Sequence, residues 1–346
     1  MNNVTVIGLD LAKHVFQVHG MDSKGTRILS RKLARKEVLQ FFATIQPCLV
    51  GIEACGGAHA WARKLMALGH TVKMMAPQYV KAFVQGNKTD ARDAAAIAEA
   101  AVRASIPSVK VKSVDEQQLQ AMLRVRDAWI KQRTALTNMV HGLIGELGDI
   151  FPRGIRHFSA NVTLWQSDHR EQLPMMTQLL DTLVEQFHRL SDQLAQIDRE
   201  LQRFMAEHIN CKRIASVPGV GPVTATTIIA QFSDAQRFSS ARKFACAIGL
   251  TPYEHSSGGK QILMGMSKRG NARVRELLIH GARAVLRHKM GKAAHADDWE
   301  MRVLQRRGHN IAVCALAAKN ARRIWALLRN QDVFRTNVTG VSVGTA

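Results

Sequence analysis

Four carboxylates in the first third of the sequence are the residues best suited to chemistry. Asp10 and Glu53 each end a short apolar run of strand length. Asp90 and Asp93 lie three residues apart, just before an alanine-rich stretch with helical character. Carboxylate oxygens are the ligands that Mg²⁺ and Mn²⁺ prefer, and a pair of such ions can cleave phosphodiester bonds. We therefore expect the four side chains to hold Mg²⁺ or Mn²⁺ against a polyanion.

Each carboxylate also has an ordinary structural explanation. Asp10 can cap a turn, and Glu53 can pair with Lys13. Asp90 can cap the following helix, with Asp93 in its first turn. The joint placement of all four favours the metal site, because residues three apart share one helix face and both can reach a single cleft.

The charge of the chain indicates a polyanionic partner. Lys and Arg outnumber Asp and Glu by 48 to 27 in 346 residues, which gives a formal net charge of +21. Residues 1–110 carry +8, residues 111–207 carry −2 and residues 208–346 carry +15. Basic ends around a near-neutral middle favour two parts that face nucleic acid and a segment that packs on protein. The alternative is a basic surface that only aids solubility.

Composition excludes several other classes of protein. Hydrophobic residues make up 46% of the chain, which is ordinary for a globular protein. No apolar run approaches the roughly 18 residues of a membrane span, and the N-terminus lacks the layout of a signal peptide. We expect a cytoplasmic protein with no membrane partner. The five cysteines show no Cys-x-x-Cys spacing, so neither a zinc site nor a disulfide framework is expected.

The strands and helices that must position the four carboxylates follow an α/β order along the chain. Apolar runs of strand length occupy 4–9, 15–19, 26–30, 48–52 and 71–76. Helical patterns occupy about 35–45, 58–68 and 91–104. Three strands followed by alternating helices and strands is the order of the RNase H-type fold. In that fold a central strand and its neighbour carry carboxylates into one cleft.

Two long helical stretches, 114–150 and 174–207, form the middle of the chain. Apolar residues alternate at spacings of three and four, and in the second stretch this seam lasts about four heptads, a strong signal for a coiled coil. Pro152, Gly154 and Pro174 between them require the chain to leave the helix and return. Two interpretations stay open: an intramolecular antiparallel hairpin and a dimerisation arm.

The last region, 208–346, is predicted to be mainly helical. Its opening contains Gly219 and Gly221 around one apolar residue, which is typical of a helix-hairpin-helix turn whose backbone N–H groups bind phosphate. A plain helix–helix turn is the alternative. Aromatic residues are only 5% of the chain, which favours contact through phosphates over base stacking. Further candidate phosphate contacts follow at a basic helix start: Lys268, Arg269 and Arg273.

Three motifs together resemble a known signature. They are Gly-Leu-Asp-Leu-Ala-Lys around Asp10, Glu-Ala-Cys-Gly-Gly-Ala-His from Glu53, and Lys-Thr-Asp-Ala-Arg-Asp-Ala, which adds Lys88 and Arg92 as candidate nucleic-acid contacts. The set is similar to the Asp-Glu-Asp-Asp signature of the one-ten family of insertion-sequence transposases, related to the Piv/MooV DNA invertases. The glutamate motif resembles the eleven-eleven subgroup of that family.

The resemblance implies a domain organisation and an activity. It implies a RuvC-like domain over 1–110, a coiled-coil dimerisation region over 111–207 and a C-terminal transposase domain over 208–346. Members cut and rejoin donor and target DNA, excise the element as a circle and insert it at specific sites. A structured non-coding bridge RNA pairs with both DNAs. The metal cleft of one subunit meets a serine of another, so we expect a dimer or a tetramer that acts on the bacterial nucleoid.

The segment 249–260 resembles the serine-bearing segment of the family. Alignment puts Ser257 at the nucleophile position, with Ser256 adjacent and still possible, and Lys260 nearby to meet a phosphate. Taken without the resemblance, Ser-Ser-Gly-Gly indicates a flexible loop. No local Ser-His-Asp pattern activates the hydroxyl, whereas a docked metal cleft would. The alternative functions are a metal-only RuvC-like nuclease, such as a Holliday-junction resolvase, and a non-catalytic scaffold.

Overall fold

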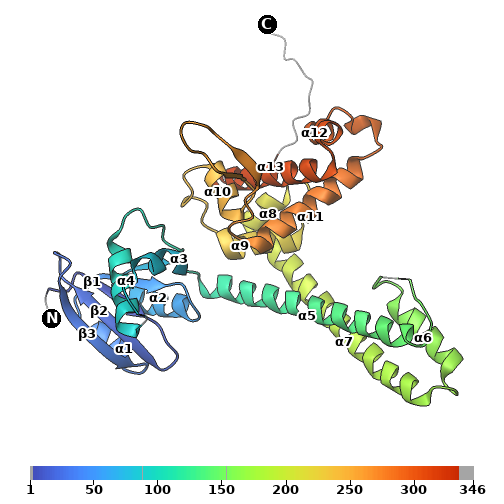
Figure 1. The fold of residues 1–346 in the computed structure, drawn as a ribbon, viewed down its shortest axis with the longest axis horizontal. Helices are drawn as coiled ribbons and strands as arrows, with labels where there is room; N and C mark the ends of the chain where they lie inside the picture. Colours follow the sequence, from blue (N-terminus) through green and yellow to red (C-terminus); the bar gives the residue numbers. More distant parts are fainter. Residues whose placement is uncertain (1–2, 88, 153, 335–346) are drawn as a thin grey trace, which may run out of the picture. The chain divides into compact units, whose positions relative to one another are not determined.

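A computed structural model describes residues 3–87, 89–152 and 154–334 (Figure 1). The chain divides into two compact units, Met1–Asp115 and Glu116–Ala346. The candidate nucleic-acid contact Lys88 lies outside the described residues. In the described ranges no helix is long and apolar enough to cross a membrane. The division into three regions stays a prediction.

The first unit is built on a five-stranded mixed sheet. Its strands are β1 (Val6–Asp10), β2 (Val15–Met21), β3 (Arg27–Ala34), β4 (Leu49–Glu53) and β5 (Thr71–Met75). The sheet order is β3-β2-β1-β4-β5. The first three strands pair antiparallel, while β4 and β5 add in parallel. All five expected strands form, in the order that the sequence predicts.

Helices cover both faces of this sheet. The helices of the first unit are α1 (Val38–Ala43), α2 (Ala58–Ala67), α3 (Pro77–Val80), the short 3₁₀ helix η1 (Lys81–Phe83) and α4 (Asp90–Val102). Apolar residues of α1 and α2 share one buried cluster with Ile7 and Leu9 of β1. The alanines of α4 share a second cluster with Val6, which points to the opposite face.

Two strand glycines let α4 lie directly on the sheet. A Cβ added to Gly8 of β1 would meet the carbonyl oxygen of Ala94 at 2.0 Å. A Cβ added to Gly51 of β4 would meet the Cβ of Ala101 at 2.7 Å. Both distances are too short for real atoms, so only glycine on the strands and alanine on the helix permit this approach. The close packing fixes where the first turn of α4 begins.

Long helices open the second unit (Figure 1). They are α5 (Val114–Gly145), α6 (Phe158–His169) and α7 (Pro174–Glu207). Leu123 near the start of α5 clusters with Leu201 near the end of α7, and Val140 clusters with Phe187. The two helices therefore pack antiparallel within one chain. Sequence analysis gave no helix in place of α6, because the exposed Leu164 on its outer face weakens the apolar period.

The remaining helices surround one apolar core. They are α8 (Ile209–Ala215), α9 (Pro222–Phe232), α10 (Ala241–Ile248), α11 (Ala272–Lys289), the short η2 (Ala293–His295), α12 (Trp299–Arg307) and α13 (His309–Asn330). A two-stranded hairpin, β6 (Pro252–Glu254) and β7 (Leu263–Met266), lies between α10 and α11 in sequence (Figure 1). Fully buried side chains from α8 to α13 form the core. The region is mainly helical, as predicted.

Candidate functional site

Asp10 and Glu53 lie side by side at the carboxyl ends of two parallel strands. The register pairs Leu9 of β1 with Ile52 of β4, so the two carboxylates follow on adjacent strands. Neighbouring strands are about 4.8 Å apart. Side chains alternate along a strand, so both carboxylates point to the face that α4 covers. The fold thus places two carboxylates at the ends of buried strands.

Asp90 and Asp93 come from the first turn of α4. Thr89 caps this helix, since its hydroxyl accepts the backbone N–H of Arg92 at 3.3 Å. Asp90 is therefore the first helical residue and not the cap. Because the sheet glycines admit α4 onto the face that bears the strand carboxylates, its first turn meets the ends of β1 and β4.

All four predicted ligands line one cavity of about 760 Å³. The remaining walls come from α3, η1 and the loop before α4: Pro77, Gln78, Val80, Lys81, Val84 and Gly86. Among the described residues, no three His, Cys, Asp or Glu side chains lie close enough together to hold a metal ion as they stand. An all-oxygen donor set spread around a cavity fits Mg²⁺, which keeps several of its waters when it binds protein.

The cavity carries a negative potential that reaches its neighbours. Burial and then the charges of Glu53 and Asp10 raise the pKa of the Cys55 thiol. A divalent cation between the carboxylates would oppose this field. The two carboxylates therefore place negative charge beside the cavity, which favours a nearby cation.

Arg92, a predicted nucleic-acid contact, holds one wall of the cavity. Its guanidinium Nη1 donates to the carbonyl oxygen of Asn87 at 2.7 Å. The same group lies against Gly86, where an added Cβ would be 3.2 Å from Nη1. Gly86 has a φ of +71°, which favours glycine. The side chain thus fixes the loop that closes the carboxylate cavity, and its contact with nucleic acid stays a prediction.

The serine segment forms a defined hairpin turn. Ser257 and Lys260 pair across the hairpin, and the Lys260 N–H donates to the Ser257 carbonyl at 3.0 Å. Gly258 and Gly259 between them have φ values of +56° and +76°. Two successive positive φ angles define a type I′ turn, which selects glycine and matches the twist of a β-ribbon. The two glycines thus form a turn between bridged residues, and the flexibility of this loop stays a prediction.

The two serines differ in how they bond. The Ser256 hydroxyl donates to Glu254 Oε1 at 2.9 Å and accepts the Ile262 N–H at 3.3 Å. Hydrogen bonds from Ser256 and Gln261 lower the pKa of the Glu254 carboxyl. The Ser257 hydroxyl makes no hydrogen bond to any residue that the structure describes. Ser256 thus holds the hairpin together, while Ser257 keeps its hydroxyl available at the turn.

Lys268 and Arg269 lie at the base of the hairpin. The Arg269 guanidinium is 5.0 Å from the centre of the Tyr253 ring, a cation–π distance. A Cβ on Gly249, which ends α10, would meet the Arg269 carbonyl at 2.0 Å. The structure thus places these two basic residues beside strand β6, which leads to the serine turn. Arg269 also packs on the Tyr253 ring. Lys268 has a φ of +55°, which is uncommon outside glycine.

Comparison with known proteins identifies the family. Residues 7–152 match a transposase family model for DEDD enzymes of IS110 elements. Residues 211–297 match a model described as the transposase IS116/IS110/IS902 family. A probable family 20 transposase of Pseudomonas aeruginosa is 45% identical over 96% of this chain and 99% of its own length. The chain belongs to the IS110 transposase family.

Two further relatives bear the names of insertion sequences. The transposase for IS1111A of Coxiella burnetii is 40% identical over 97% of this chain and 92% of its own length. The transposase for IS1328 of Yersinia enterocolitica is 37% identical over 96% of this chain and 99% of its own length. The protein is therefore a transposase, an enzyme that cleaves and rejoins DNA, and it contains a RuvC-like DEDD domain within the matched residues 7–152.

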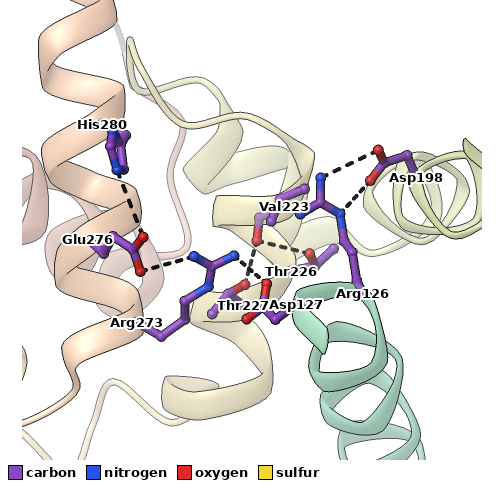
Figure 2. A network of polar contacts seen from close by, with 9 residues as sticks. All are labelled: Arg126, Asp127, Asp198, Val223, Thr226, Thr227, Arg273, Glu276 and His280. Atoms are coloured by element: carbon purple, nitrogen blue, oxygen red, sulfur yellow. Dashed lines mark hydrogen bonds and ion pairs between the residues drawn. The ribbon is translucent and has the colours of Figure 1, made fainter. Parts of the chain in front are cut away.

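Arg273 of the transposase is engaged inside its second unit (Figure 2). From the first turn of α11 it pairs with Asp127 of α5 and with Glu276 at 3.0 Å. Arg126, which precedes Asp127 in α5, pairs with Asp198 of α7 at 2.6 Å. This network ties α11 to the two long helices. A role for Arg273 in nucleic-acid binding stays a prediction, and its partner Asp127 lies too far away along the chain to be recognised from sequence.

The predicted helix-hairpin-helix turn joins α8 to α9. Gly219 has a φ of +86°, and a Cβ there would meet the carbonyl oxygen of Gly281 in α11 at 2.6 Å. The Asn320 side chain donates to the Pro218 carbonyl at 3.0 Å. Close backbone packing thus accounts for Gly219, as in the alternative of a plain turn. Gly221 is exposed at the start of α9. The N-terminus of α9 at Gly221 therefore stays a better candidate than Gly219 for binding a phosphate.

Sequence reasoning missed the residues that position the site. Gly8, Gly51 and Thr89 bring the carboxylates together without contributing a ligand. Glycine inside a strand often marks a close backbone approach, and threonine before a helix marks a cap. Those signals are present in the sequence, but they do not say which helix approaches which strand.

Proposed function

We propose that the transposase uses Asp10, Glu53, Asp90 and Asp93 as ligands of Mg²⁺ or Mn²⁺ and Ser257 as its nucleophile. The convergence of four carboxylates from three segments on one cavity carries the proposal. The unbonded Ser257 hydroxyl at an ordered turn supports the second part. When bound, the metal would stabilise charge on the phosphate and favour loss of the serine proton.

Strand cleavage then follows from the chemistry of a serine nucleophile. The Ser257 Oγ attacks phosphorus and forms a phosphoserine bond, while the bond from phosphorus to the leaving strand breaks. The leaving oxygen ends as a hydroxyl with the proton that the serine gave up. In the second step a DNA hydroxyl attacks the phosphoserine, which restores the phosphodiester and the free serine. No phosphate bond energy is lost, so the DNA can be rejoined without a high-energy cofactor.

We further propose that a structured bridge RNA guides the enzyme to donor and target DNA, as the family resemblance implies. The charge of +15 over residues 208–346 supports contact with more than one nucleic acid. Exposed Gly221, Lys260 and Lys268 are the candidate phosphate contacts in this region. Sequencing the RNA that co-purifies with the protein tests this part, and recovery of only random cellular RNA would contradict it.

The assembled enzyme is proposed to be a cytoplasmic dimer or tetramer. The antiparallel pair of α5 and α7 is proposed as a coiled-coil dimerisation arm. Exposed apolar side chains at its far end, Ile150 and Met175, support contact with another copy. In such an assembly the cavity of one subunit acts with Ser257 of another.

A metal-only nuclease, such as a Holliday-junction resolvase, is the second candidate function. It is favoured by one observation, since no His, Asp or Glu side chain hydrogen-bonds to the Ser257 hydroxyl among the described residues. Two-metal sites cleave DNA with water and need no serine. The two candidates differ in whether a covalent protein–DNA intermediate forms.

A trapping experiment with matched serine variants separates the candidates. Labelled DNA is incubated with wild type, Ser257→Ala and Ser256→Ala protein and Mn²⁺, then run on a denaturing protein gel. We expect labelled protein with wild type and with Ser256→Ala, and none with Ser257→Ala. Cleavage by Ser257→Ala at the wild-type rate would establish the metal-only reaction. An adduct that disappears only in Ser256→Ala would move the nucleophile to Ser256.

A further inference from the structure

A second cavity lies at the base of the serine hairpin, within the second unit. Its volume is about 460 Å³, inside the range of about 300–1,000 Å³ that small-molecule sites occupy. Its walls come from α10, the start of β6, the end of β7 and α13. Apolar side chains form most of the lining, among them Leu250, Met266 and Ala315. A water-filled polar site would not need such a lining.

Two arginines from different helices line this cavity. Arg242 belongs to α10 and Arg322 to α13, and both are exposed. Neither makes a hydrogen bond or an ion pair with any described residue. Their neighbour Arg323, by contrast, donates to Asn320 and stacks on the Phe334 ring. The Arg242 charge contributes to the lowered pKa of the Glu254 carboxyl. The N–H donors of both guanidinium groups are nevertheless unused and can bind an anion.

The cavity also offers one uncommitted polar group. Thr251 lines it, and its hydroxyl makes no hydrogen bond to a described residue. An apolar cavity with one hydroxyl and two available guanidinium groups matches a ligand that joins a flat ring to phosphates. Arginine binds phosphate with paired N–H donors, and apolar walls accept the faces of a nucleobase. A nucleotide unit of DNA has this combination of groups.

The position of the cavity relates it to the proposed reaction. Pro252, which lines it, is five residues before Ser257 on the hairpin. Five residues of extended strand span at most about 17 Å, at about 3.3 Å per residue. At about 3.4 Å per nucleotide, that span corresponds to about five nucleotides. DNA attacked by Ser257 would therefore have its neighbouring bases within reach of the cavity.

We propose that this cavity binds one unstacked DNA base within about five nucleotides of the cleaved phosphate, with Arg242 and Arg322 on the phosphates around it. The distance in nucleotides rests on the proposed role of Ser257, whereas the base-binding site itself does not. A base held in this way would keep the cut strand end from leaving before it is rejoined. It would also add sequence preference through Thr251.

The test uses 2-aminopurine, whose fluorescence rises when it leaves the base stack. A short duplex that carries the cleavage junction mapped with wild-type protein is substituted at one position at a time. Each duplex is bound by Ser257→Ala protein with its co-purifying RNA in EDTA, so neither cleavage nor metal is needed. We expect a several-fold rise at one or two positions within about five nucleotides of the junction, and none beyond.

Variants of the cavity assign the signal to it. Ala315→Trp fills the cavity and should abolish the rise, with DNA affinity changed less than tenfold. Arg242→Gln and Arg322→Gln should each weaken the rise and lower the salt dependence of binding by about one ion, whereas the exposed Arg306→Gln on α12 should leave the fluorescence rise unchanged. The arginines lie on the surface, so their variants remain informative if Ala315→Trp fails to fold.

Three results would overturn the proposal. They are no rise at any position, a rise that survives both arginine variants, and a rise only when the substituted strand is RNA. The proposed nucleophile is judged separately by covalent trapping. A rise in fluorescence without any covalent adduct in wild type would leave the base site standing and remove the role of Ser257.

Discussion

The carboxylate cavity and the serine hairpin are built in opposite ways. Asp10 and Glu53 are the last residues of strands whose inner residues, such as Leu9, are 0% exposed. The hairpin instead exposes its apolar residues, with Leu263 at 53% and Met264 at 57%. One site is therefore fixed by tertiary packing on both faces of a sheet. The serine hairpin is held by local hydrogen bonds and by the packing of Arg269 at its base.

This difference matches the two chemical tasks that we propose for these sites. Metal ligands must keep their spacing to within a fraction of an ångström, which a packed sheet and helix provide. A nucleophile that must reach DNA needs an ordered turn with open surroundings. The type I′ turn supplies order without burying Ser257. We therefore expect mutations to act on the first site through packing and on the second through local bonds.

The largest effect is expected from Asp10→Asn. Loss of one ligand charge removes several kcal/mol of metal-dependent stabilisation, which corresponds to about a 10³-fold slower cleavage. Cleavage rate and Mn²⁺ binding by calorimetry measure it. Asp115→Asn, an exposed carboxylate of the same unit, is the control and should change neither. Equal losses of cleavage rate and Mn²⁺ binding in both variants would show that the total negative charge of the unit matters, and not the carboxylate in this cavity.

Gly8→Ala tests whether packing fixes the cavity. The added Cβ would lie 2.0 Å from the Ala94 carbonyl, so α4 must shift, at a cost of about 3 kcal/mol in the free energy of unfolding. Urea unfolding measures that free energy. Gly142→Ala in α5 has no atom within 4 Å of the added Cβ and should instead stabilise by about 0.5–1 kcal/mol. Unchanged stability in Gly8→Ala would contradict the close approach of α4.

Arg92→Gln distinguishes a positioning residue from a phosphate contact. Loss of the bond to Asn87 releases the loop at Gly86, and we expect about tenfold weaker Mn²⁺ binding, of the size seen when supporting groups of metal sites are removed. The salt dependence of DNA binding in EDTA should stay the same. A slope that falls by about one ion, with Mn²⁺ affinity unchanged, would assign Arg92 to DNA instead.

Ser256→Ala should have a smaller effect. It removes two hydrogen bonds inside an exposed hairpin, and such bonds contribute about 1 kcal/mol each at most. We expect faster hydrogen exchange at the Ile262 N–H and about a fivefold slower cleavage. A loss of cleavage rate as large as that caused by Ser257→Ala would mean that Ser256 takes part in the reaction itself.

The smallest effect concerns pH. Hydrogen bonds from Ser256 and Gln261 lower the pKa of Glu254, so the bonds that hold the hairpin are present above the ordinary pKa of glutamate. They are lost as pH falls through the lowered pKa of Glu254, which lies below the ordinary pKa of glutamate. Hydrogen-exchange protection at the Ile262 N–H should therefore be constant from about pH 5 to 8 once corrected for intrinsic rates. A loss of protection near pH 6 would point to a different group.

Much of the first unit could be predicted because its signals are local. The apolar runs before Asp10 and Glu53 gave both strands, and the alanines after Asp93 gave the helix. The position of a carboxylate at a strand end follows from the chain itself. The missed helix α6 shows the limit of this method, since an exposed leucine on its outer face obscures the period.

The contacts of the candidate nucleic-acid-binding residues were less predictable than the positions of the four carboxylates. A basic residue is recognised from sequence, but its partner is not. Arg273 is paired with Asp127, which lies 146 residues earlier, and Arg92 turns back onto its own loop. Arg242 drew no attention in sequence, and Arg322 only as part of a basic C-terminal stretch, yet both line a cavity and neither has a hydrogen-bonded or ion-paired partner among the described residues.

The sequence by itself determined which residues can do chemistry and which local elements carry them. It determined the strand ends at Asp10 and Glu53, the pair on the first turn of α4, and the glycines of the serine turn, because these depend on neighbours within a few residues. Only the tertiary structure decided that α4 lies on the face bearing both strand carboxylates, and that a cavity with two available arginines adjoins the hairpin. Such contacts join distant segments, and they depend on how whole surfaces pack.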